Sequence, residues 1–167
     1  LESSTLKPGE LIFLPYLSGE RTPHNNPNAQ GVFFGLSHKH GTKELTQAVL
    51  EGVAFAFGDC QEVLLDAGAE INEVSIIGGG SKSHLWTQIL ASVLERPMIR
   101  HDSSEMGPAL GAARLAMISN NSGSIEEICQ RPRIKEIVEP NHEHVPQYRN
   151  FRERYRRLYR HLEDEFS

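Results

Sequence analysis

Residues 73–97 read EVSIIGGGSKSHLWTQILASVLERP, and the order of side chains in this stretch decides the fold that we expect for the chain. The stretch opens with a short apolar run that ends in three glycines, as a buried strand entering a tight turn would. Beyond the glycines, apolar residues recur at the spacing of one helical face until Pro97 ends the pattern. The stretch therefore predicts a strand, a glycine turn and a helix.

Similar units on both sides of this stretch predict an α/β fold. Thr42 is a suitable N-cap for a long helix with one apolar face, and Gly68 provides its stop. After the central stretch come a short strand at 98–101 and a helix with Pro108 in its first turn. Because parallel strands need crossover connections, this alternation predicts a mostly parallel sheet flanked by helices.

The two ends of the chain follow other patterns. Apolar runs at 11–17 and 31–36 predict strands, joined by a loop at 18–30 that is rich in proline and asparagine. Residues 120–147 combine three prolines with many charges and predict a segment that wraps the surface. From Tyr148 onward, aromatic residues at helical spacing alternate with arginines, which predicts an amphipathic terminal helix.

The composition is that of a globular protein. With 167 residues, 38% hydrophobic and 23% charged, the chain is long enough for one domain with a hydrophobic core. We expect a single domain over 1–167, in which 120–167 form a peripheral surface segment and the terminal helix. A net charge of -5 gives no general attraction to nucleic acid or to an anionic membrane, and no apolar run approaches the ~20 residues that cross a bilayer. We therefore expect a cytoplasmic protein without nucleic-acid or membrane partners.

The histidines and carboxylates do not form a catalytic or metal-binding pattern. Pairs of histidines with two-residue spacing, lacking a nearby cysteine or carboxylate cluster, are poor zinc ligands, so we expect no metal site of the chain itself. Asp102 and Glu105 are interpreted as helix-entry and turn residues rather than as an acid and a base. The histidine pairs are His38 with His40 and His142 with His144.

The glycine turn and the polar loop are the two candidate binding features. Glycines at 78–80 permit positive φ angles and close approach of a ligand, although an ordinary tight turn would use them equally well, and they match neither dinucleotide nor P-loop motifs. In the loop, Arg21 could hold a phosphate or a carboxylate in bidentate fashion. The alternative is that Glu20 and Arg21 form a surface ion pair of little energetic value.

Four blocks of the sequence resemble one known family. They read LPYLSGERTPHNNPNAQGVFFGLSHKHG, AVLEGVAFAF, IIGGGSKSHLWTQILASVL and MGPALGAARLA. In this order and spacing they resemble the carboxy-terminal domain of the FGGY family of carbohydrate kinases, over nearly the whole chain and more loosely beyond Asn120. The resemblance implies an actin-like ATPase (ribonuclease H-like) fold, incomplete at its amino-terminal end, within a two-domain enzyme that uses ATP and magnesium.

The resemblance also implies roles for particular residues. Ser81 stands in the glycine motif, whose backbone lies against adenosine, at a position where the family commonly has alanine. His84 falls where relatives place a side chain near adenine. Glu20 and Arg21 match a hallmark near an interdomain cleft or a subunit contact. The nucleotide site that the resemblance implies comprises Gly78, Gly79, Gly80, Ser81, Ser83 and His84.

The expected reaction follows from the branch of the family that the blocks resemble. In that branch D-xylulose accepts the γ-phosphoryl group of ATP, giving D-xylulose 5-phosphate. The resemblance implies that the general-base aspartate, the first phosphate-binding turns and most of the sugar site lie upstream of Leu1, so the chain alone should be inactive and hold no catalytic residue. Two alternatives remain open: a kinase for glycerol, gluconate or ribulose, or a non-catalytic module that forms a homodimer through Tyr155 and Leu158.

Overall fold

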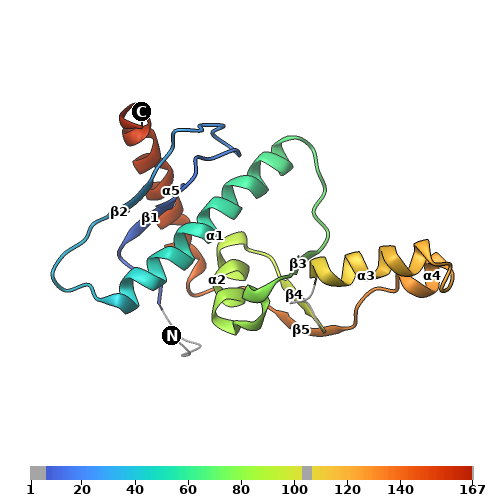
Figure 1. Ribbon diagram of the computed structural model, residues 1–167. Helices are drawn as coiled ribbons and strands as arrows, with labels where there is room; N and C mark the ends of the chain where they lie inside the picture. The colour runs from blue at the N-terminus through green and yellow to red at the C-terminus, as the bar shows by residue number, and fades with distance from the viewer. Residues whose placement is uncertain (1–6, 103–106, 167) are drawn as a thin grey trace.

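Helix α1 (Thr42–Asp66) runs through the middle of the structure, a computed structural model that describes residues 7–102 and 107–166 (Figure 1). A pair of strands and the terminal helix α5 lie on one side of α1, and α2 with a second sheet lies on the other. The predicted long helix is thus confirmed, and it is packed on two sides. The other elements are β1 (Ile12–Pro15), β2 (Gly31–Phe34), β3 (Val74–Ile76), α2 (His84–Leu94), β4 (Met98–His101), α3 (Gly107–Ser119), α4 (Ile125–Ile128), β5 (Ile134–Val138) and α5 (Val145–Leu162).

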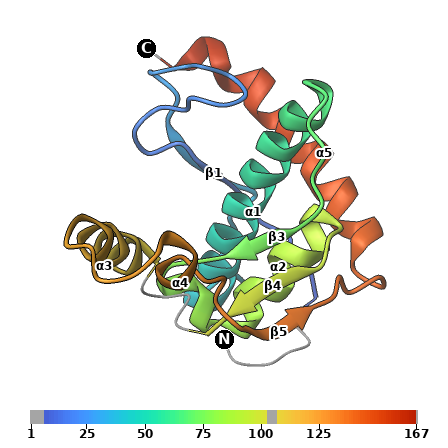
Figure 2. The same ribbon diagram turned by 90° about the vertical axis from the view of Figure 1, so that its right-hand side faces the viewer.

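The strands form two small sheets, and only one of the three pairings between named strands in the described residues is parallel. Strand β3 runs parallel to β4, joined by the crossover through α2, as the central stretch predicted. Strand β5 pairs antiparallel with β4 (Figure 2), and β1 pairs antiparallel with β2 (Figure 1). The prediction of a mostly parallel sheet was therefore wrong. The loop between β1 and β2 contains no helix that would return the chain to the end of the sheet at which β1 begins. Strand β2 therefore runs in the direction opposite to β1.

The carboxy-terminal segment is less peripheral than the sequence suggested. Residues 120–147 were expected to wrap the surface, yet they contain β5, which completes the order β3-β4-β5. Helix α5 is amphipathic as predicted, but Tyr155 and Tyr159 on its apolar face are 0% and 2% exposed. Leu158 also packs against the core. The aromatic face of α5 is thus covered by the chain itself and is not free to form the dimer contact through Tyr155 and Leu158.

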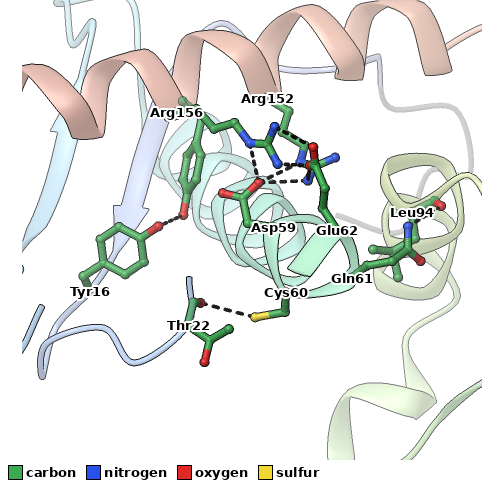
Figure 3. Close-up of polar contacts among 10 residues, drawn as sticks. Tyr16, Thr22, Asp59, Cys60, Gln61, Glu62, Leu94, Arg152 and Arg156 are labelled. Carbon is green, nitrogen blue, oxygen red and sulfur yellow. Dashed lines mark hydrogen bonds and ion pairs between the residues drawn. The ribbon is translucent and has the colours of Figure 1, made fainter. Parts of the chain in front are cut away.

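A cluster of ion pairs joins α1 to α5. Asp59 is buried, and its Oδ1 accepts hydrogen bonds from Arg152 Nε at 2.9 Å and from Arg156 Nε at 2.7 Å (Figure 3). Glu62, one turn further along α1, accepts from Arg152 Nη2 at 2.6 Å and also pairs with Arg156. The Glu62 side chain is 44% exposed, whereas that of Asp59 is 2% exposed. The buried carboxylate is therefore the centre of the cluster.

We predict that the two carboxylates differ in their contribution to stability. Asp59→Asn keeps an acceptor oxygen but removes the buried negative charge that the two guanidinium groups share, and should lower the free energy of unfolding by about 3 kcal/mol. Glu62→Gln removes a solvent-screened pair and should cost less than about 1 kcal/mol. Urea denaturation of both variants measures the difference, and equal losses would contradict the central role of Asp59.

The contribution of Glu62 should also depend on pH. The hydrogen bond from Arg156 is the main cause that lowers the pKa of Glu62 below its ordinary value of 4.5. Because the pKa is depressed in the folded state, the stabilisation is fully present above pH 4.5 and is lost as the pH falls through the folded pKa. The stability difference between the wild type and Glu62→Gln should therefore shrink between about pH 7 and pH 3. Urea titrations at both pH values test this, and a constant difference would refute it.

Candidate functional site

The glycine turn connects β3 to α2 as predicted, with a short 3-10 helix inserted between them. Gly78 has φ 86° and ψ −175°, a backbone conformation that is essentially restricted to glycine. The residues Gly79–Lys82 form the 3-10 helix, and Ser81 N donates to the carbonyl of Gly78 at 3.0 Å. The Ser81 hydroxyl donates to the same carbonyl at 2.7 Å and is buried. Ser81 therefore stabilises the shape of the turn through both its backbone and its side chain.

Ser83 begins helix α2. Its Oγ accepts a hydrogen bond from Trp86 N at 3.2 Å, the standard arrangement of an N-cap serine. Its carbonyl accepts from the backbone N–H of Thr87 at 3.1 Å and from the Thr87 hydroxyl at 2.9 Å. The structure thus gives Ser83 a structural role, and its contact with a nucleotide stays a prediction.

The backbone of the turn is open at Gly78 and Gly79. A Cβ atom added at either residue would meet no atom within 4 Å, apart from immediate neighbours. At Gly80, by contrast, a Cβ would lie 3.0 Å from both Cδ1 and Nε1 of Trp86. A flat ligand can therefore approach the backbone at Gly78 and Gly79, while a side chain at Gly80 would meet the indole of Trp86.

Two residues that the sequence analysis did not select hold this turn against the sheet. Arg100 of β4 is 9% exposed, and its Nε donates to the carbonyl of Ser81 at 2.8 Å. Its Nη2 donates to the carbonyl of Lys82 at 3.3 Å, and its Nη1 pairs with Glu136 of β5. The other carboxylate oxygen of Glu136 lies 3.2 Å from His84 Nδ1. The sequence carried one signal for this network, an arginine inside the short apolar strand at 98–101.

The turn lies at the carboxyl ends of the two parallel strands. Strand β3 leads into Gly78, and β4 leads toward α3, whose first residue is Gly107. A Cβ at Gly107 would lie 3.5 Å from Ile77 Cδ1, so the start of α3 is next to the residue that precedes the turn. Of the MGPALGAARLA block, Met106 lies outside the described residues, as does Glu105.

The predicted residues of the polar loop serve a different part of the fold. Glu20 Oε2 accepts a hydrogen bond from His24 N at 2.7 Å, and Glu20 N donates to the carbonyl of Asn26 at 2.8 Å. Glu20 therefore closes the loop on itself and does not pair with Arg21. Arg21 is exposed and makes no hydrogen bond or ion pair within the described ranges. The alternative of a Glu20–Arg21 surface ion pair is not realised.

The same loop is attached to α5 and α1. The His24 ring stacks on Tyr159 with a centroid separation of 3.6 Å, and burial lowers the pKa of His24. Asn26 Nδ2 donates to the Tyr159 hydroxyl at 3.1 Å, and Cys60 Sγ donates to the carbonyl of Thr22 at 3.4 Å. In both ribbon views this loop lies beside the end of α5, well apart from the connection between β3 and α2 (Figures 1 and 2). The structure thus does not bring Glu20 and Arg21 to the glycine turn.

A cavity of about 520 Å³ lies between this loop, α1 and α5. His24 Nε2 and Asp59 Oδ2 beside it are buried without a hydrogen-bond partner among the residues that the structure describes. In residues 7–102 and 107–166, no three His, Cys, Asp or Glu side chains are grouped so that they could hold a metal ion. No helix in those ranges has the length and apolarity needed to cross a membrane. The lining of the cavity includes His24, Asp59, Glu62, Arg156 and Arg160.

Solved structures identify the class of the fold. The crystal structure of a xyloylose kinase from Brucella ovis superimposes with a TM-score of 0.83 at 42% identity, covering 96% of this chain and 34% of that one. Gluconate kinase from Lactobacillus acidophilus superimposes with a TM-score of 0.75 at 29% identity, covering 93% of this chain and 32% of that one. These neighbours are sugar kinases with the actin-like ATPase fold, which confirms the predicted fold class.

The sequence comparison identifies the family. Residues 1–120 match the model of the FGGY family of carbohydrate kinases, C-terminal domain. The chain is 46% identical over 151 residues to the xylulose kinase of Escherichia coli (strain K12), which covers 90% of this chain and 31% of that protein. The chain belongs to the FGGY family of carbohydrate kinases, as the four sequence blocks indicated. It spans about a third of the length of these relatives.

We predict that the first two glycines of the turn respond differently to substitution. Gly78→Ala forces an alanine into the glycine-only conformation and should lower the free energy of unfolding by about 1–3 kcal/mol. Gly79→Ala meets open space, and Gly79 does not have a positive φ, so its effect should stay within about 0.5 kcal/mol. Urea denaturation compares the two variants, and equal stability of both would contradict the role of Gly78.

Proposed function

We propose that this chain binds ATP and ADP at the turn comprising Gly78–His84, as the nucleotide-binding part of a kinase that converts D-xylulose to D-xylulose 5-phosphate. The observation that carries the nucleotide site is the open glycine backbone at the carboxyl end of β3. Ligands of open α/β sheets bind outside the carboxyl ends of the strands, and here the parallel strands β3 and β4 both end at this place.

The shape of the turn leaves room for a flat group of the nucleotide. Gly78 and Gly79 leave room for a nucleobase or a ribose against the backbone, because neither position carries a side chain. The carbonyls of Ser81 and Lys82 face Arg100 and are already satisfied, so the ligand would use the opposite face of the turn. We assign no side chain of this chain to magnesium, and propose that the nucleotide phosphates hold it.

The acceptor sugar is proposed from the similarity to relatives. The relatives that are 46% and 42% identical to this chain are named as a xylulose kinase and a xyloylose kinase, which favours D-xylulose. Another xylulose kinase is 30% identical, close to the 29% of the gluconate kinase, so gluconate, glycerol and ribulose remain the alternatives. We propose that the sugar and the general base are held by the part of the enzyme to which this chain does not correspond. Arg21 is exposed and has no partner among the described residues, so it is a candidate for a side chain that faces the interdomain cleft.

Calorimetric titration of the chain with magnesium and ADP tests the nucleotide site. Gly79→Leu fills the open backbone and should weaken binding at least about tenfold, equivalent to about 1.4 kcal/mol, without changing the unfolding midpoint. The matched control is Gly111→Leu, because a Cβ at Gly111 in α3 also meets no atom within 4 Å. Absence of binding to the wild type, or equal weakening by both substitutions, would refute the site.

A chimera tests the reaction. We expect that the Escherichia coli xylulose kinase, with its matching carboxy-terminal third replaced by this chain, releases ADP in the presence of D-xylulose, because the Escherichia coli part supplies the sugar site and the base while this chain supplies the nucleotide site. The chain alone should show no turnover in the same coupled ADP assay. Turnover by the chain alone at the rate of the chimera would contradict the proposal that the base and the sugar site lie elsewhere.

A further inference from the structure

We propose that the cavity between the polar loop at 18–30, helix α1 and helix α5, which we call the loop cavity, binds a small uncharged polyol such as a free sugar. In both ribbon views the polar loop lies well apart from the connection between β3 and α2 (Figures 1 and 2). The loop cavity is therefore a second site, and the proposed nucleotide binding does not require it.

Two polar atoms beside the loop cavity lack a hydrogen-bond partner among the described residues. They are Nε2 of His24 and Oδ2 of Asp59, and both are buried. The Asp59 side chain is 2% exposed, and its Oδ1 already accepts from Arg152 and Arg156. In Figure 3 its other oxygen points away from these arginines, on the side where Thr22 lies, and Thr22 directly precedes the loop residues of the lining. Because unpaired buried polar atoms cost free energy, an occupant that pairs both is favoured.

The charges around the loop cavity favour an uncharged occupant. The described lining has three arginines and four carboxylates. Arg152 is outside this lining and pairs with two of the carboxylates, those of Asp59 and Glu62, so the charges balance. His24 adds no charge near neutral pH, because burial lowers its pKa below the ordinary value of 6.5. Neither an anion nor a cation therefore gains from the net charge of the site.

Hydroxyl groups can pair both unpartnered atoms. An ionised carboxylate only accepts hydrogen bonds, so Oδ2 of Asp59 needs a donor. Neutral His24 offers either a donor or an acceptor at Nε2, according to its tautomer. A hydroxyl group is both a donor and an acceptor, and two neighbouring hydroxyls of a polyol satisfy the two atoms with either tautomer. A ligand with acceptors alone would leave Asp59 unpaired.

The size and the rest of the lining suit a molecule larger than water. The volume of about 520 Å³ lies within the range of about 300–1,000 Å³ of small-molecule sites, whereas one water takes up about 30 Å³. Pro23 and Val63 contribute apolar surface, which the C–H groups of a sugar can contact. Arg157 and Arg160 of the lining are exposed and can donate to further hydroxyls. These features together match a compact polyol.

Titration of the ¹⁵N-labelled chain with xylitol tests the site, with inorganic phosphate as the charged comparison. The ¹H–¹⁵N spectra follow the backbone amides of His24, Val63 and other residues of the lining. We expect saturable shifts of these amides with xylitol and a dissociation constant below about 10 mM. Phosphate at the same concentrations should produce no saturable shift, because the charges of the site balance.

Substitutions in α1 locate the bound polyol. Val63→Trp fills the loop cavity without removing a polar group, and should weaken xylitol binding at least about tenfold. The matched control is Leu64→Trp, at the next residue of α1, which is exposed and outside the lining. It should leave the affinity unchanged. His24→Leu removes one unpartnered atom and should also weaken binding about tenfold, which tests the site even if Val63→Trp does not fold.

The possible results are distinct. Without a saturable shift by xylitol, the occupant is water and the inference is overturned. Phosphate binding as tightly as xylitol would make the loop cavity an anion site, and equal weakening by Val63→Trp and Leu64→Trp would place the polyol elsewhere. Either result also overturns it. None of these results bears on ADP, whose binding is measured separately with Gly79→Leu, so failure of the polyol site and failure of the proposed function are distinguishable.

Discussion

The burial of helix α1 on two sides is the constraint on which the rest of the structure depends. A Cβ at Gly52 would collide with the backbone of Phe13 in β1, so this strand can approach α1 only because the residue is glycine. A Cβ at Gly58 would likewise lie 2.9 Å from Arg152 Nε of α5. The close contacts bring Asp59 within reach of the arginines of α5, and the opposite side of α1 stays free to pack against α2. The glycines of α1 thus set the spacing on the β1 and α5 side of the helix.

The glycine turn depends on a second set of contacts, which strands β4 and β5 provide. Arg100 links the turn to β4 through two carbonyls, and Glu136 extends this link to β5 and to His84. Both strands are needed, because β4 supplies the cation and β5 supplies the carboxylate. The candidate site is therefore supported by the sheet rather than by the turn residues alone. The polar loop with Glu20, by contrast, is attached to α5 and has no part in this arrangement.

Most elements could be predicted from local patterns, and the errors share one cause. The strand, glycine turn and helix around Gly78, the long α1 and the amphipathic α5 each have a repeating pattern within their own residues. Strand β5, with the sequence IKEIV, is mostly exposed and has two adjacent charged residues, so no apolar alternation marked it. The direction of the strands was also predicted wrongly. The residues within a strand indicate that it forms, but they do not indicate which other strand it pairs with. The alternative of a dimer contact through Tyr155 stayed open for the same reason, because an apolar helical face does not show whether the chain itself or a second copy covers it.

The sequence by itself determined the order of strand, turn and helix and the membership of the FGGY family, because both are carried by neighbouring residues and by the order of the blocks. It also located the open glycines at 78–80, since few other residues suit such a turn. Only the tertiary structure decided that Arg100 and Glu136 hold this turn, and that Glu20 closes its own loop instead of pairing with Arg21. Arg100 and Glu136 are 36 positions apart, and such a pairing is created by the packing of whole strands.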